Sequence, residues 1–95
     1  MRIWTKLMEK EKIIKDSVFV LPNDYNINRL SLYLSDICND LDIAMPILLA
    51  KHYQHLYFFK GTTFTQSDFI DACQFDKMVC ELIPDENDKK KNFIY

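Results

Sequence analysis

Two short stretches near the ends of the chain alternate between apolar and other side chains, and this period of two constrains the fold more than any other feature. In "RIWTKLM", Ile3 and Leu7 fall on one side, and Trp4 and Lys6 fall on the other. "KMVCELI" at 77–83 alternates in the same way. Because successive side chains of a β-strand point to opposite faces of a sheet, both stretches predict strands.

The segment after the first strand predicts a hairpin followed by a helix. The polar run "EKEK" suits a turn, and "IIKDSVFVL" is rich in β-branched and aromatic residues until Pro22. No Asn-Gly or Asp-Gly pair fixes the turn type, so a longer or bulged connection stays open. Apolar residues at helical spacing then predict a helix over residues 28–41.

Two more helices are expected in the middle of the chain. Pro46 suits the first turn of the second, and Gly61 the left-handed cap that closes it near residue 59. In "FTQSDF", Thr65 and Asp68 form a capping box, which predicts a short third helix over 66–73. The buried side of the second helix is expected to carry Leu48, Leu49, His52, Tyr53, Leu56 and Phe59.

The order β-β-α-α-α-β predicts an α+β fold with a three-stranded, mainly antiparallel sheet and helices packed on one face. The last strand is expected beside the first. Residues 1–84 are expected to form a single small domain, followed by a polar and flexible tail over 85–95.

Composition narrows the function classes. A formal net charge of -2 gives no general attraction to nucleic acid or anionic lipid. The charged N-terminus has no signal-peptide pattern, and no apolar stretch is long enough to span a membrane. The odd number of cysteines, Cys38, Cys73 and Cys80, all among apolar neighbours, is typical of reduced, buried thiols. We therefore expect a cytoplasmic protein.

The residues that can support chemistry form no catalytic pattern, so we expect a protein that is not an enzyme and needs no cofactor. One glycine in 95 residues argues against phosphate-binding and dinucleotide-binding loops. His52 and His55, three residues apart on one helix, can approach a common metal ion with a cysteine as third ligand. No metal-binding spacing accompanies them, and we expect one packed and one solvated histidine. Asp40 and Asp42 are interpreted as helix-end residues rather than a Mg²⁺ site.

Five strings spread along most of the chain carry a family resemblance: "RIWTK", "KIIKD", "KHY", "TTFTQSDFI" and "FDKMVCELI". Together they resemble a group of short, uncharacterised bacterial proteins of similar length. The resemblance implies a bacterial, cytosolic origin. It implies no activity and assigns no site residues.

The single tryptophan points to the most specific functional hypothesis. If Ile3 and Leu7 face the helices, the open side of the sheet carries Trp4 with Val79 and Ile83, and with either Phe19 or Val18. Tryptophan and arginine are over-represented among the residues that dominate protein interfaces. We therefore expect a non-enzymatic interaction module, self-associating as a homodimer or binding a protein partner, whose interface contains Trp4, Arg2, Lys6, Val79 and Ile83.

One alternative uses the basic residues of the hairpin. Arg2, Lys6, Lys12 and Lys15 offer a positive patch to nucleic acid or to a regulatory ligand. A second alternative, a small metal-binding protein, rests on His52 and His55. A third places Trp4 in the core, with Ile3 and Leu7 half exposed, or has the C-terminal tail fold over Trp4.

Overall fold

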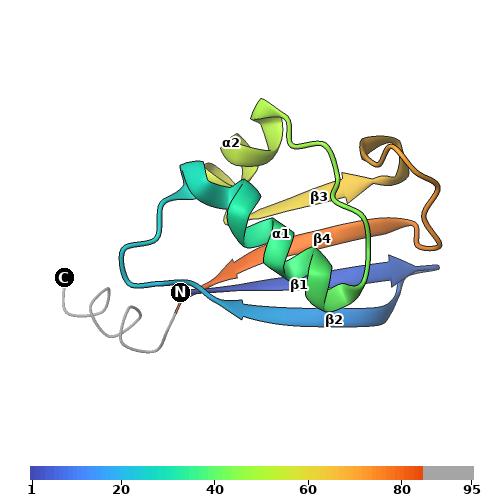
Figure 1. The fold of residues 1–95 in the computed structure, drawn as a ribbon, viewed down its shortest axis with the longest axis horizontal. Helices are drawn as coiled ribbons and strands as arrows, with labels where there is room; N and C mark the ends of the chain where they lie inside the picture. The colour runs from blue at the N-terminus through green and yellow to red at the C-terminus, as the bar shows by residue number, and fades with distance from the viewer. Residues whose placement is uncertain (85–95) are drawn as a thin grey trace.

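The computed structural model describes residues 1–84, which form a four-stranded antiparallel sheet with two helices on one face (Figure 1). The sheet order is β2-β1-β4-β3. The α+β class and the pairing of the last strand with the first are confirmed. The tail expected over 85–95 lies outside the described residues. The elements are β1 (Arg2–Glu9), β2 (Lys12–Val20), α1 (Leu30–Leu41), α2 (Ala50–Phe59), β3 (Gly61–Thr65) and β4 (Lys77–Ile83).

The expected three-stranded sheet is wrong, because β3 adds a fourth strand between α2 and the capping box. β3 pairs antiparallel with β4, and Thr62 and Phe64 are buried on its helix side. The capping box itself is present, with the Thr65 backbone N–H donating to Asp68 Oδ2 at 2.9 Å. It starts only the 3-10 turn Gln66–Asp68, and Phe69 is already extended, so the helix expected over 66–73 does not form.

β1 and β2 form a hairpin with a two-residue turn and one bulge. Lys10 and Glu11 both have positive φ, 50° and 66°, which is the type I′ geometry that matches the twist of paired strands. The Lys10 backbone N–H donates to Asp76 Oδ2 at 2.7 Å and so connects the turn to the segment before β4. The register shifts between Leu7 and Met8, where Ile14 is the extra residue on β2.

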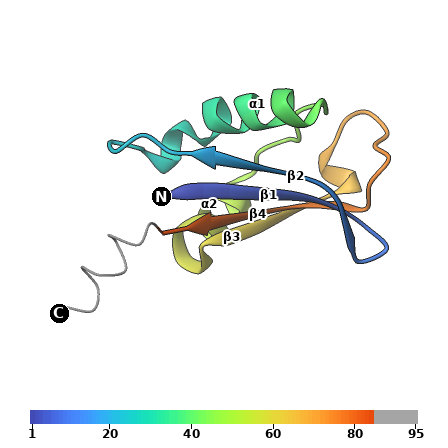
Figure 2. The same cartoon turned by 90° about the horizontal axis from the view of Figure 1, so that it is seen from below.

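α1 confirms the helix expected over 28–41, whose first residues form the 3-10 turn Ile27–Arg29. Its buried stripe is the one that the spacing predicts, and it lies over β2 (Figure 2). Two side chains of β2 hold it there: Ser17 Oγ donates to Asp40 Oδ2 at 2.6 Å, and Lys15 Nζ donates to the Leu41 carbonyl at 2.7 Å. α1 ends where Asp42 adopts the left-handed conformation.

α2 begins later than Pro46 suggests. Pro46 is buried in an extended connection, and the helix starts at Ala50, where His52 Nδ1 accepts the Leu49 N–H at 3.0 Å. The helix ends at residue 59 as expected, but the left-handed residue that ends it is Lys60, with φ 60°. Gly61 has no positive φ and instead begins β3.

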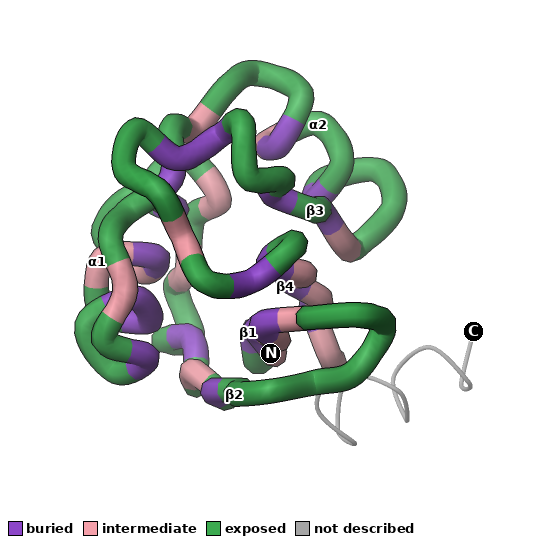
Figure 3. Tube along the Cα trace, turned by 90° about the vertical axis from the view of Figure 1, so that its right-hand side faces the viewer, coloured by how far each residue is buried: buried purple, intermediate pink, exposed green. Residues whose placement is uncertain are grey.

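The core lies between the helices and one face of the sheet (Figure 3). Ile3 and Leu7 of β1 face it together with Met78, Cys80 and Leu82 of β4, so this is the buried one of the two faces that the alternation leaves open. The alternative that places Trp4 in the core is therefore wrong. Within residues 1–84, no helix covers the opposite face of the sheet (Figure 2).

Candidate functional site

The open face of the sheet gathers the residues that the sequence singles out. β1 and β4 pair so that Arg2 lies opposite Ile83, and Lys6 opposite Val79, with Trp4 between these pairs opposite Glu81. All five expected interface residues thus share one face. Val79 and Ile83 are half-buried there, not fully exposed.

Trp4 sits in a chain of polar contacts across this face. Its indole Nε1 donates to Asp16 Oδ2 at 2.9 Å, and Lys6 Nζ lies 4.2 Å from the ring centroid in a cation–π contact. The same ammonium is 2.6 Å from Glu81 Oε1. These contacts explain why a tryptophan alternates in step with charged residues. Of the charged residues on this face, Lys6 lies over the ring, and Asp16 accepts the indole N–H.

The most exposed apolar side chains of this face belong to β2. Val18 lies opposite Trp4 and Val20 opposite Arg2, and their exposed fractions are 53% and 70%. Of the two residues expected as alternatives on the open face, Val18 therefore lies there and Phe19 does not. Phe19 lies opposite Ile3 on the helix side, where its ring centroid is 5.9 Å from that of Tyr33.

β2 also carries backbone groups directed away from the sheet. It stands at the end of the strand order, and the Leu21 N–H donates to the Met1 carbonyl at 3.0 Å. Hydrogen-bonded and non-hydrogen-bonded pairs alternate along an antiparallel ladder. Phe19 and Ser17 therefore bond to β1, whereas Val18 and Val20 direct their N–H and C=O groups off an edge with which no other strand of residues 1–84 pairs.

Only part of this edge is protected against pairing with another chain. Lys12 and Lys15 place charges along its first half, and the bulge at Ile14 interrupts its regular geometry, which are devices that discourage edge pairing. Residues 17–20 carry no charge and no bulge. The second half of β2 is therefore a short edge that is regular and apolar on its open side.

The basic patch of the hairpin is not continuous. Lys15 donates to the Leu41 carbonyl on the helix side of the sheet, whereas Lys6 is paired with Glu81 on the open side. Lys12 lies opposite Glu9 next to the turn. The register thus separates the lysines that the nucleic-acid alternative needs to act together.

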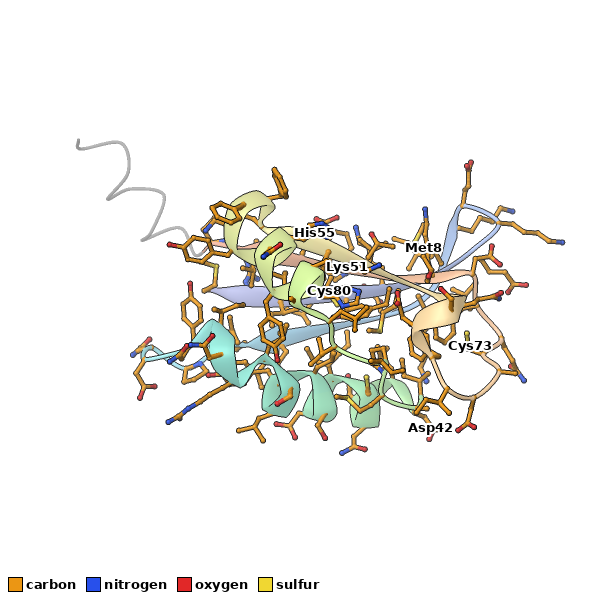
Figure 4. The ribbon with its side chains drawn as sticks, turned by 90° about the horizontal axis from the view of Figure 1, so that it is seen from above. Met8, Asp42, Lys51, His55, Cys73 and Cys80 are labelled. Carbon is orange, nitrogen blue, oxygen red and sulfur yellow. The ribbon has the colours of Figure 1, made fainter. Side chains whose placement is uncertain are left out.

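The two histidines have different environments, as expected. His52 is fully buried, its ring is stacked on Phe64, and its Nε2 lies 3.7 Å from Asp68 Oδ2 without a hydrogen-bond partner. His55 is exposed on α2 (Figure 4), with Nδ1 3.5 Å from Thr62 Oγ1. Within residues 1–84, no three His, Cys, Asp or Glu side chains are grouped in a way that suits a metal ion.

Burial shifts the pKa values of ionisable groups in the core. Burial raises the pKa of the Cys38 thiol to about 11 and that of Cys80 to about 12, so both stay protonated and poorly nucleophilic at neutral pH. Cys73 is only half-buried, against the expectation for all three, and its Sγ lies 3.5 Å from the Phe75 carbonyl. Burial lowers the pKa of His52 and outweighs the opposite effect of the Asp68 carboxylate.

α2 ends in three exposed aromatic side chains, one of which was expected to be buried. Tyr57, Phe58 and Phe59 end α2 with exposed fractions of 64%, 68% and 76%, although Phe59 was placed in the core. Only His52 and Leu56 are buried on this helix. Three consecutive residues of a helix point in directions about 100° apart, so the run itself was the signal that they cannot share one buried face.

Comparisons with known proteins found no matching family model, no matching curated protein and no matching solved structure. None of the helices described within residues 1–84 is long and apolar enough to cross a membrane.

Proposed function

We propose that this chain is a non-enzymatic interaction module that self-associates by pairing the β2 edges of two copies. The observation that carries the proposal is the second half of β2, where Val18 and Val20 combine exposed side chains with outward backbone groups. An edge of this kind is a template for adding another strand. The proposal also includes a cytoplasmic location, which the unpaired state of the three cysteines supports.

A two-fold axis near Val18 suits the sequence of the edge best. Antiparallel pairing about this residue sets Val18 beside Val18 of the second copy, and Asp16 beside the other copy's Val20. Each such pair exchanges both of its backbone hydrogen bonds. The same arrangement separates the two Asp16 carboxylates, which a centre at Asp16 would bring together. The open faces then join into one surface that carries two Trp4 rings.

Proline substitutions on the two edges of the sheet test this proposal. Proline has no N–H, so it blocks strand addition where that N–H points outward and leaves the ladder inside the sheet intact. Val18→Pro is expected to convert a dimer into a monomer that stays folded. The measurement is molar mass by analytical ultracentrifugation, with circular dichroism to verify folding.

Thr63→Pro is the matched control. The Leu82 N–H donates to the Lys60 carbonyl, so the alternation along β3 directs the Thr63 N–H away from β4 at the opposite edge of the sheet. This variant is expected to remain a dimer. A wild-type chain that is monomeric at every concentration, or equal loss of assembly in both proline variants, would refute pairing through β2.

A further inference from the structure

A cleft of about 470 Å³ opens on the helix side of the sheet, beyond the end of α1. It lies between the bulged part of the hairpin, the residues that follow α1, and the loop over 69–75. Figure 4 shows Asp42 and Cys73, from two of these segments, at the same end of the molecule. Pockets that hold small molecules have volumes of about 300–1,000 Å³. The cleft therefore has room for a small organic ligand.

The floor of the cleft is apolar and fixed by the core. Leu7, Leu41, Phe69 and Phe75 line it, and each is at most 7% exposed. The rings of Phe69 and Phe75 meet edge to face, with centroids 5.3 Å apart and an interplanar angle of 84°. Because these side chains also pack in the core, the floor is formed without a ligand and needs little ordering on binding.

The β-bulge supplies one wall of the cleft. Ile14 is the extra residue of β2, and it lines the cleft beside Leu7 with half of its side chain exposed. Bulges re-aim side chains and occur more often than expected next to functional sites. Here the bulge holds a large apolar side chain at the cleft, where an apolar ligand would remove it from water.

The charged residues at the mouth of the cleft favour a ligand of one charge over the other. Asp42 and Asp71 line it, while Lys15, the one cation among the lining residues that the structure describes, already donates to the Leu41 carbonyl at 2.7 Å. The C-terminal end of α1, which carries a partial negative charge, also lies at the mouth of the cleft. A cationic group therefore meets the more favourable field.

We infer that the cleft binds a small organic amine, with its apolar body on the phenylalanine floor and beside Ile14, and its ammonium group near Asp42 and Asp71. The inference is independent of edge pairing. The cleft lies on the helix side of the sheet, whereas the apolar side chains of the β2 edge lie on the open side. Its ligand class follows from an apolar floor combined with an acidic mouth.

The test titrates the whole chain with pairs of ligands that share an apolar body and differ in charge. Tryptamine is compared with indole-3-propionate, phenethylamine with 3-phenylpropionate, and octylamine with nonanoate. Backbone amide shifts in NMR spectra report the site and the affinity. At least one amine is expected to shift the residues that line the cleft, and its carboxylate counterpart to bind at least about tenfold more weakly.

Two variants make the test specific. Ala72→Trp fills the cleft from an exposed position and should abolish amine binding, whereas Ala50→Trp, exposed on α2 outside the cleft, should leave it unchanged. Asp42→Asn keeps a residue that tolerates the left-handed conformation and should reduce the preference for amines. The inference is overturned if no amine shifts the cleft, if amines and carboxylates bind equally, or if Ala72→Trp binds normally.

Discussion

At the scale of single residues, polar contacts fix the orientation of Trp4, which lies on the open face of the sheet. Asp16 fixes the indole N–H, and Lys6 covers part of the ring while pairing with Glu81. The Lys6–Glu81 pair is only partly exposed, and ion pairs at a protein surface contribute about 0–1 kcal/mol to stability. The network therefore serves to orient the ring more than to stabilise the fold, which agrees with a role for the open face in binding.

His52 makes the stability of the fold depend on pH. Its pKa is lowered by burial, so the unfolded chain binds a proton at a higher pH than the folded chain does. Its contribution is complete above the ordinary histidine pKa of about 6.5 and is lost as the pH falls from there towards the folded pKa. Protonation of Nδ1 would also remove the acceptor for the Leu49 N–H at the start of α2.

His52→Gln is expected to remove most of this pH dependence. Urea unfolding at pH 7.5 and pH 5.0 measures it: the wild-type chain should lose stability at the lower pH, and the variant should lose much less. The acceptor oxygen of glutamine offers a neutral replacement for Nδ1.

His55→Gln is the control for this prediction. His55 is exposed, so its variant should retain the wild-type response to pH. An equal response in the His52→Gln variant and the wild-type chain would show that the buried imidazole is not responsible.

At the scale of elements, the hairpin turn holds two residues in a conformation that they disfavour. Lys10 and Glu11 both lie in the left-handed region, which costs roughly 1–2 kcal/mol for each residue with a side chain. Asn and Gly are the residues preferred at these two positions of a type I′ turn. The hydrogen bond from the Lys10 backbone to Asp76 offsets part of the cost.

The double substitution Lys10→Asn, Glu11→Gly is therefore expected to raise the free energy of unfolding by about 1 kcal/mol. It retains the backbone donor to Asp76, and urea unfolding measures the change. Lys12→Gly, which places glycine within β2, should instead lower stability. A double variant no more stable than the wild-type chain would contradict this account of the turn.

The elements also show which parts of the fold were predictable. β1, β4 and α1 have clear periods. These predicted the buried stripe of α1 and which residues share a face of β1 and β4, but not which of the two strand faces is buried. β3 escaped prediction because it has five residues, three of them threonine, and follows α2 after a single residue. The third helix failed because Phe69 leaves the helical region to pack on Phe75. Pro46 did not mark the first turn of α2, because an extended connection also accommodates proline.

The candidate site was predictable only in part. Alternation placed Trp4 and its four companions on one face, and their register confirms that they share it. The burial of Ile3 and Leu7 shows that this face is the open one. The polar network around the ring depends on cross-strand neighbours such as Asp16, which a single sequence does not reveal. The cleft depends on a bulge and on two loops distant in sequence, so no local pattern indicated it.

At the scale of the whole molecule, the two edges of the sheet differ. β3 follows directly from α2 through Lys60 and is short, whereas β2 is longer and has an apolar, uncharged second half. Natural proteins usually protect long edges against pairing. An edge protected along one half only is consistent with controlled pairing through the other half, which is the central claim of this account.

Amide hydrogen exchange at Val18 and Val20, measured by NMR across a range of protein concentrations, tests that claim most directly. Neither amide bonds to β1, so both should exchange rapidly in dilute samples and become protected as the concentration rises. The outward amide of Thr63 on the other edge should remain unprotected throughout. Rapid exchange of Val18 and Val20 at every concentration would contradict assembly through β2.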